Sequence, residues 1–132
     1  MSLKQFLKSI ENKESAPSLS PLFELSNLMD SEIEDFFVSW VNIPTIHKHR
    51  VMQGILELSH ERAELDFSDL LVRCLDDEDS IVRQKAIEGL WECEDRSLVR
   101  TLCQILSQDS SADVRAAAAQ GLGRFAFLSQ EG

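Results

Sequence analysis

The clearest pattern of apolar and polar positions occurs twice, in residues 80–90 (SIVRQKAIEGL) and in residues 112–122 (ADVRAAAAQGL). In both stretches a Val, an Ala and a Leu follow one another at intervals of four residues, which places them in one stripe on a helix. The pattern therefore predicts an amphipathic helix in each stretch. The identical pairs, at a constant offset of 32 residues, are Val82/Val114, Arg83/Arg115, Ala86/Ala118, Gly89/Gly121 and Leu90/Leu122.

A second apolar pattern at helical spacing precedes each of these helices, so the repeated unit is a pair of helices. A two-helix unit with a period in the thirties is typical of a solenoid, because one unit cannot bury its apolar face alone. Residues that can accept hydrogen bonds from unpaired amides stand before the predicted helices. The apolar positions are Phe67, Leu70, Leu71, Cys74 and Leu75, then Leu98, Leu102, Ile105 and Leu106; the predicted caps are Asp66, Asp79, Asp95 and Ser111.

A third, fainter helix pair is predicted before these two. Ser31 and Glu34 have the spacing of a capping box, and Pro44 suits the first position of the second helix, in which Gly54 echoes Gly89. The apolar positions of its first helix are Ile33, Phe36, Phe37, Trp40 and Val41, and those of a separate N-terminal helix are Leu3, Phe6, Leu7 and Ile10.

Glycine in a helix costs about 1 kcal/mol relative to alanine, so Gly89 and Gly121 predict that helices approach closely there.

Together these patterns predict an all-α fold. The expected architecture is an α-solenoid, or alpha-alpha superhelix, of about three antiparallel helix pairs plus one or two N-terminal helices. Residues 31–132 are expected to form the repeats, at approximately 31–59, 66–93 and 95–128. Residues 1–30 are expected to form an N-terminal capping segment, with one helix, a linker at residues 12–21 and two helical turns in LFELSNL (22–28).

An Asp followed six residues later by an Arg occurs in both clear repeats, as Asp77 with Arg83 and as Asp109 with Arg115. In this spacing the chain resembles the HEAT-repeat family, in particular the short bacterial form that is also found in phycobilisome chromophore lyases. AIEGLWE, residues 86–92, is similar to a segment of bacterial HEAT proteins. The resemblance implies that these four residues form a structural ladder between successive turns, and a guanidinium fork matches a carboxylate in this role.

The formal net charge is −10, and both halves of the chain are acidic. Such a surface repels phosphate backbones and anionic lipid heads, so we expect no nucleic acid, no membrane, and a protein partner that is basic or neutral. The same charge disfavours a DNA-repair glycosylase of HEAT-like repeats, whose groove would be basic. No apolar run of about 18 residues and no secretory signal is present, which favours a cytoplasmic location.

The number of cysteines is odd, which favours reduced, buried thiols at Cys74, Cys93 and Cys103.

No constellation of catalytic, cofactor-binding or metal-binding residues is recognisable. His47 and His49 are two residues apart, which separates them by about 200° around a helix, so they cannot chelate one ion without ligands from elsewhere. No Gly-rich phosphate loop and no nucleophile elbow is present. We therefore expect no cofactor, and the sequence argues against enzymatic activity in this segment.

The exposed positions of the second helices remain as the candidate for function. Counted from the repeated glycine, Gln53, Glu88 and Gln120 precede it by one residue, and Glu57, Glu92 and Arg124 follow it by three. These residues form two polar stripes, which either bind a partner or only solvate the helices. Trp91 lies beside the apolar stripe and is either a binding anchor at the edge of a groove or part of the packing between units.

The leading hypothesis is a non-catalytic protein-interaction scaffold that binds a protein partner on the concave face of the solenoid. The alternative is part of a phycobilisome-type chromophore lyase, which would need a deep pocket with an acidic residue facing an aromatic ring.

The last predicted helix has a large apolar content after AAAA (116–119), at Leu122, Phe125, Phe127 and Leu128. We expect either further repeats beyond this end or self-association through it.

Overall fold

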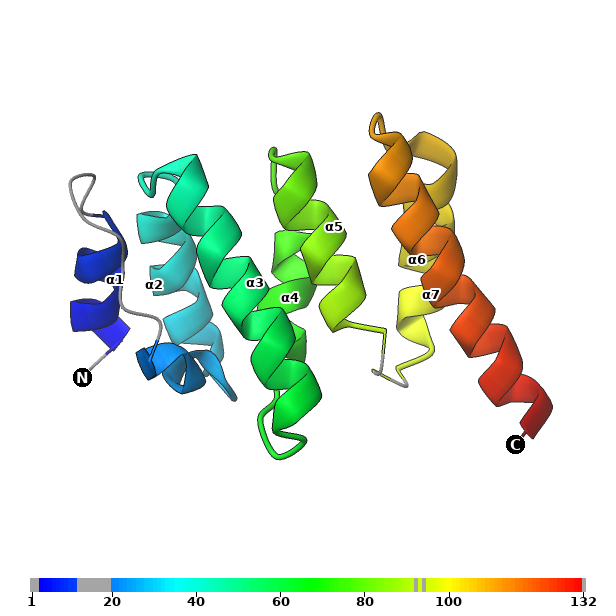
Figure 1. Cartoon of the computed structure of the whole chain (residues 1–132), viewed down its shortest axis with the longest axis horizontal. Coiled ribbons are helices and arrows are strands. Elements are labelled where there is room, and N and C mark those ends of the chain that lie inside the picture. Colours follow the sequence, from blue (N-terminus) through cyan, green and yellow to red (C-terminus); the bar gives the residue numbers. More distant parts are fainter. Residues whose placement is uncertain (1–2, 12–19, 92, 94, 132) are drawn as a thin grey trace. The chain divides into compact units, whose positions relative to one another are not determined.

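The computed structural model of the chain describes residues 3–11, 20–91, 93 and 95–131, with side chains as far as residue 126 (Figure 1). Within these residues the protein has seven α-helices, one 3₁₀-helix and no strand, which confirms the predicted all-α fold. The elements are α1 (Leu3–Glu11), η1 (Ser20–Leu25), α2 (Asp30–Trp40), α3 (Thr45–Glu61), α4 (Ser68–Cys74), α5 (Ser80–Gly89), α6 (Ser97–Gln108) and α7 (Ala112–Glu131). Most of the predicted linker at 12–21 lies outside the described residues.

The order of the elements is that of three successive helix pairs preceded by α1 and η1. The pairs are α2 with α3, α4 with α5, and α6 with α7, and short turns join the helices within each pair. The chain divides into two compact units, residues 1–70 and residues 71–132, and the boundary falls inside α4.

The first unit has a core built around aromatic rings from α2. Trp40 is 2% exposed, and its ring stacks on that of Phe36 with 5.0 Å between the ring centroids. The buried Lys48 of α3 places its Nζ 5.5 Å from the Trp40 ring centroid, so a cation lies over an aromatic face. Helix α1 packs against α2 and η1. A hydrogen bond of 2.9 Å between Nδ1 of the buried His47 and the Ile10 carbonyl connects α1 to α3.

Two predicted helix starts differ from the structure. The capping box at Ser31 and Glu34 is wrong by two residues, because α2 begins at Asp30 and the Glu32 carboxylate accepts a hydrogen bond from the Met29 amide at 3.0 Å. Asp30 and Glu32 both lie in the first turn, where the positive end of the helix dipole favours carboxylates. Pro44 is the N-cap of α3 rather than its first residue.

One predicted core position of the first unit is also wrong. Val41 is 74% exposed, because α2 ends at Trp40 and the stripe of apolar positions ends with it. Phe37 is only half-buried, although its ring makes an edge contact with Phe36.

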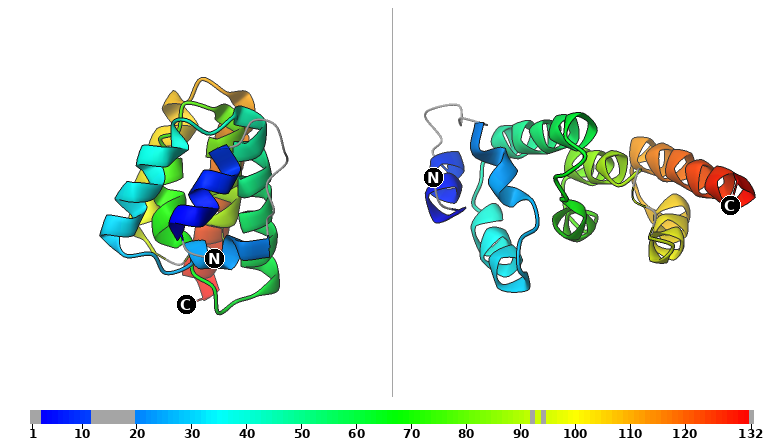
Figure 2. Two further views of the ribbon diagram at one scale, coloured as in Figure 1. Left: turned by 90° about the vertical axis from the view of Figure 1, so that its left-hand side faces the viewer. Right: turned by 90° about the horizontal axis from the view of Figure 1, so that it is seen from below.

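In the second unit α7 packs on both α5 and α6. Figure 2 shows α5 and α7 side by side in one layer with α6 in the other, and α6 and α7 run antiparallel (Figures 1 and 2). The predicted stripe of Val82, Ala86 and Leu90 is buried, as are Val114 and Ala118 in α7.

The predicted caps Asp79 and Ser111 are confirmed, whereas the predicted cap Asp95 precedes Arg96, which is the N-cap of α6. Asp79 accepts hydrogen bonds from the amides of Ile81 and Val82, and Asp66 and Asp95 accept from the amides two residues further along the chain. The Ser111 hydroxyl accepts from the Val114 amide at 3.4 Å. These side chains satisfy amides that the first turn of a helix leaves without an intrahelical partner.

The expectation of three buried thiols is wrong for two of them. Cys74 is buried, and burial raises the pKa of its thiol, which makes this thiol unreactive. Cys93 is half-buried and Cys103 is exposed on α6, because the amphipathic α6 turns Cys103 away from the buried Leu102. Leu106, predicted as a core position, is 40% exposed, although it follows the buried Leu102 by four residues.

The predicted close approach of helices at the repeated glycines is confirmed. A Cβ atom on Gly89 would lie 2.8 Å from Cδ1 of Leu71. On Gly121 it would lie 3.2 Å from Cδ1 of Leu102 and 3.3 Å from Cδ1 of Trp91. At Gly123, two residues further along α7, no atom of the described residues, apart from its chain neighbours and the backbone of α7, would lie within 4 Å.

This contrast gives a prediction with an internal control. Gly123→Ala should raise the free energy of unfolding by about 0.5–1 kcal/mol, because alanine is the better helix former and the space is open. Gly121→Ala gains the same propensity but forces the Leu102 and Trp91 side chains to move, so its net effect should be near zero or destabilising. Urea denaturation followed by circular dichroism measures both variants. Equal stabilisation by the two would contradict close packing at Gly121.

Candidate functional site

The Arg83 guanidinium lies between the α4–α5 turn and the α6–α7 turn. Its Nε and Nη2 donate to the two carboxylate oxygens of Asp109, at 2.9 and 3.0 Å. Its Nη1 donates to the carbonyls of Asp77 and Glu78, at 2.9 and 3.1 Å. The side chains of Arg83 and Asp109 are only 14% and 9% exposed. A bidentate ion pair with so little access to water fixes the geometry of the two turns.

Arg115 repeats part of this arrangement one repeat later, because its Nη1 donates to the Asp109 carbonyl at 2.6 Å. The two aspartates also close their own turns in the same way. Asp77 accepts from the Asp79 amide and Asp109 accepts from the Ser111 amide, both at 2.9 Å. The structure thus brings Asp77, Arg83, Asp109 and Arg115 into one network of turns.

The predicted polar stripes fall in both units. On α3, the half-buried Gln53 donates from Nε2 to the exposed Glu57 at 3.2 Å. On α5, the half-buried Glu88 accepts from Gln84 at 3.1 Å. Gln120 is exposed on α7, and Glu92 lies outside the described residues.

Trp91, which follows α5 by two residues, and Arg124 of α7 connect these two segments within the second unit. The Trp91 indole donates to the Ala117 carbonyl of α7 at 3.3 Å, and its ring lies against Gly121. A second hydrogen bond joins the same segments, because Nε of Arg124 donates to the Trp91 carbonyl at 3.1 Å. Both residues therefore connect the end of α5 to α7, and they contribute to the packing between these elements.

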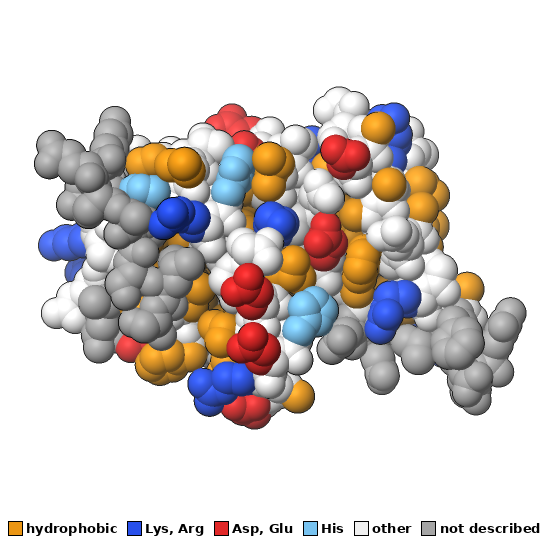
Figure 3. Space-filling view, viewed as in Figure 1, with side chains coloured by type: hydrophobic (Ala, Val, Ile, Leu, Met, Phe, Trp, Pro, Cys, Tyr) orange, Lys and Arg blue, Asp and Glu red, His pale blue; other side chains and the backbone are white. Residues whose placement is uncertain are grey.

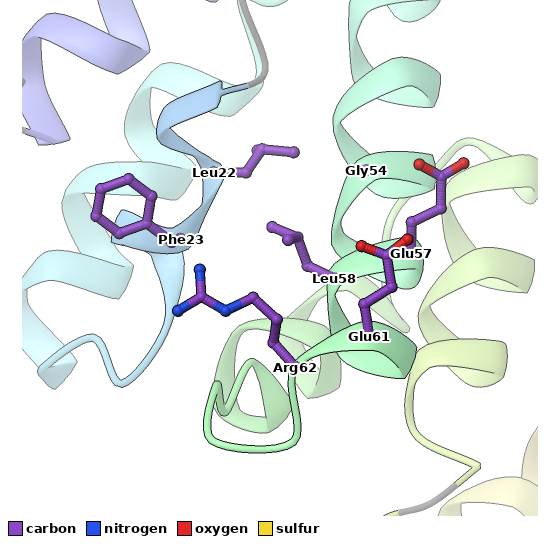
Figure 4. A pocket seen from close by; sticks show the side chains of 7 residues that line it. All are labelled: Leu22, Phe23, Gly54, Glu57, Leu58, Glu61 and Arg62. Carbon is purple, nitrogen blue, oxygen red and sulfur yellow. The ribbon is translucent and has the colours of Figure 1, made fainter.

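A pocket that no sequence pattern predicts lies between η1 and α3 in the first unit (Figure 4). Its volume is about 240 Å³. Leu22 and Leu58 point toward each other across it, and Glu57 and Glu61 lie on its α3 side (Figure 4). The residues that line it are Leu22, Phe23, Gly54, Glu57, Leu58, Glu61 and Arg62. We call it the η1–α3 groove.

The comparison with protein families agrees with the repeats of the second unit. Residues 68–131 match the family model of HEAT repeats. The match begins at the first residue of α4 and includes α5, α6 and α7, so the turns joined by Arg83 belong to the two successive helix pairs that the match covers. With the all-helical structure it supports the predicted α-solenoid class. Searches of curated proteins and of solved structures gave no significant match.

The η1–α3 groove lies outside the HEAT match, and its sequence signal is weak. Phe23 stands in LFELSNL, which has only the apolar spacing of a short helix, and the distance of Glu57 from Gly54 predicts only a place in a polar stripe. Three acidic residues in the second half of α3 and the loop after it, Glu57, Glu61 and Glu64, were a visible signal. Acidic side chains follow this part of α3 on the surface (Figure 3).

The histidines do not meet in one site. His47 is buried against Ile10, whereas His49 lies on a different side of α3 and is half-buried. In the described part of the chain no group of three or more His, Cys, Asp or Glu side chains is placed to hold a metal ion. No described helix is long and apolar enough to cross a membrane.

The ion pair between Arg83 and Asp109 predicts a specific loss of stability in acid. Burial raises the pKa of Asp109, but hydrogen bonds from Arg83 and the Ser111 amide, with the charges of Arg83 and Arg115, lower the pKa below its usual value. A carboxylate with a lowered folded-state pKa stabilises the protein above its unfolded-state pKa of about 3.9, and this contribution disappears as the pH falls through the folded-state value.

Wild-type protein should therefore lose stability steeply below about pH 4. In Asp109→Asn, which is less stable at neutral pH, the loss between pH 5 and pH 3 should be smaller. Urea midpoints measured across this range test the difference, with the exposed Asp76→Asn as the control that retains the wild-type slope. If the urea midpoint fell equally with pH in Asp109→Asn and in wild type, the loss of stability in acid could not be assigned to the ion pair between Arg83 and Asp109.

Proposed function

We propose that this chain is a non-catalytic protein-interaction scaffold that binds a protein partner on the face formed by the second helices of its repeats. The supporting observation is the HEAT match over α4 to α7, since HEAT repeats generally serve as protein-interaction scaffolds. In this match the ladder residues are engaged in the turns, whereas Gln120 is exposed on α7. The partner would be basic or neutral, because the chain has a net charge of −10.

The proposal assigns three repeats, at approximately 31–59, 66–93 and 95–128, with residues 1–30 as a capping segment and a cytoplasmic location. Gln53, Glu57, Glu88 and Gln120 are its exposed or half-buried polar positions, and Glu92 belongs to the same stripe by sequence. Trp91 and Arg124 would contribute by holding the end of α5 against α7. The four ladder residues are assigned a structural role.

Retention of a partner on immobilised protein tests the proposal. Proteins retained from an extract, identified by mass spectrometry, should be lost or reduced at least fivefold with Glu88→Lys, because this change reverses a charge on the proposed face. Glu78→Lys makes the same change in charge in the α4–α5 turn, away from the stripe, and should retain the partner. Equal retention by the two variants would mean that the proposed face is wrong.

Self-association through the C-terminal repeat is a second part of the proposal. Phe125 of α7 is half-buried, and the side chains of Phe127 and Leu128 lie outside the described residues. Light scattering should show a mass that rises with concentration. A monomer at every concentration would contradict self-association.

The chromophore-lyase alternative gains no support from the η1–α3 groove. Pockets for small organic ligands usually have about 300–1,000 Å³. The groove has about 240 Å³.

A further inference from the structure

The η1–α3 groove has the size of a site for one apolar side chain. A protein cavity of about 150 Å³ is large enough to hold benzene, and pockets for whole ligands begin at about 300 Å³. The groove, at about 240 Å³, lies between these limits. Its apolar lining is Leu22, which is buried, Leu58, which is half-buried, and Phe23 at the rim.

Phe23 is an aromatic side chain held by a fixed element although it is 49% exposed. Leu22 and Leu25 on the same 3₁₀-helix are each 1% exposed and anchor it to the core. The segment after η1 is fixed by two hydrogen bonds of 2.8 Å, from the Asn27 amide to the Asp66 carbonyl and from the Asp66 amide to the Ser26 hydroxyl. An exposed ring on a fixed element loses little entropy on binding, and aromatic residues are common binding anchors.

The α3 side of the groove has acidic residues in positions that do not favour the helix. Glu57 and Glu61 are four residues apart, so their like charges repel by a few tenths of a kcal/mol. Glu61 lies in the last turn of α3, where the helix dipole favours cations, and Glu57 lies one turn earlier. Glu57 accepts a hydrogen bond from Gln53, but the repulsion between the two carboxylates and the position of Glu61 at the helix end are both unfavourable for folding. A bound cation would relieve both effects.

The cation that the groove itself contains is already engaged. Arg62 forms an ion pair with Glu64, with 2.8 Å between its Nε and Oε1 of the glutamate. Together Glu57, Glu61, Arg62 and Glu64 leave the rim negative. The charge of the rim is thus complementary to a basic ligand.

We propose that the η1–α3 groove binds a basic peptide segment of a protein partner. An aliphatic side chain of the segment enters between Leu22 and Leu58 and contacts Phe23, and a neighbouring Lys or Arg pairs with Glu57 and Glu61. The inference rests on the proposed scaffold function and adds a docking position outside the HEAT match, which shares Glu57 with the proposed face and has a defined ligand chemistry.

A peptide titration tests the groove without a natural partner. The probe is the capped peptide Ser-Lys-Arg-Leu-Lys-Ser, added to the isotope-labelled full chain and followed by backbone amide NMR signals. The shifts should concentrate in residues 22–25 and 54–62. Replacing the peptide leucine with glycine should weaken binding at least fivefold, and the charge-reversed peptide Ser-Glu-Glu-Leu-Glu-Ser should not bind.

Protein variants separate the two kinds of contact. Phe23→Ala should weaken binding of the basic peptide at least fivefold, and the double variant Glu57→Gln/Glu61→Gln should do the same and remove most of the salt dependence. The matched control Asp35→Asn/Glu78→Gln also removes two exposed acidic residues, but outside the groove, and should change affinity less than twofold. Circular dichroism checks that every variant is folded.

The groove assignment is overturned if the peptide shifts other residues or none, if the acidic peptide binds as well as the basic one, or if the control loses as much affinity as Glu57→Gln/Glu61→Gln. Such a result leaves the scaffold proposal intact, because Glu88 lies outside the groove and its partner retention is measured separately. The opposite result is equal partner retention by Glu88→Lys and Glu78→Lys, together with binding of the basic peptide at the groove. It would refute the scaffold face and leave the groove as a peptide site.

Discussion

Replacing Arg83 with alanine should lower the free energy of unfolding by about 3 kcal/mol or more, because it leaves the carboxylate of Asp109 with little water and without its cation. The variant also removes the donors that bind the carbonyls of Asp77 and Glu78. Urea denaturation followed by circular dichroism measures the loss.

Two further variants make the interpretation specific. Arg83→Lys retains the positive charge but not the fork that reaches both oxygens of Asp109, so it should fall between the wild type and Arg83→Ala. Arg100→Ala removes an exposed arginine of α6 and should change stability by less than about 0.5 kcal/mol. If Arg83→Ala were no more harmful than Arg100→Ala, the bridge would be an incidental surface contact.

The second large effect is expected in the first unit, at Trp40. Trp40→Ala should cost about 3–5 kcal/mol, because it removes a large ring that is 2% exposed and leaves a cavity beside Phe36. It also leaves the buried ammonium of Lys48 without the aromatic face below it. Circular dichroism is the suitable probe, since the chain has only two tryptophans and this variant removes one.

Trp40→Phe keeps an aromatic face and should cost clearly less than Trp40→Ala. The exposed Val38→Ala on the same helix should be close to neutral. A loss of less than about 1 kcal/mol in Trp40→Ala would show that the stacked rings do not support the core.

The helix pairs were predictable because their apolar positions repeat. Val82, Ala86 and Leu90 recur at the same phase as Val114 and Ala118, and a period that appears twice identifies both the helix and its buried face. The Asp and Arg positions of the ladder were visible for the same reason. Their direction was not, because spacing within one repeat cannot show that Arg83 reaches forward to Asp109 rather than to the carboxylate of Asp77.

The helix ends and the groove were harder to predict for local reasons. The start of α2 depends on the extended backbone of Met29 and on Glu32 folding back to its amide, and several polar residues in DSEIED suit an N-cap equally well. The η1–α3 groove joins residues that are 31 to 40 positions apart in the chain. No periodicity relates Phe23 to Glu57, so only the folded arrangement brings them together.

The bridge from Arg83 to Asp109 also determines how the second unit can come apart. Fraying of α6 and α7 away from α5 would separate two opposite charges that have little access to water, so detachment of this hairpin has a high energetic barrier. Partial unfolding from that end is therefore suppressed, and the helices joined by the bridge behave as one cooperative block.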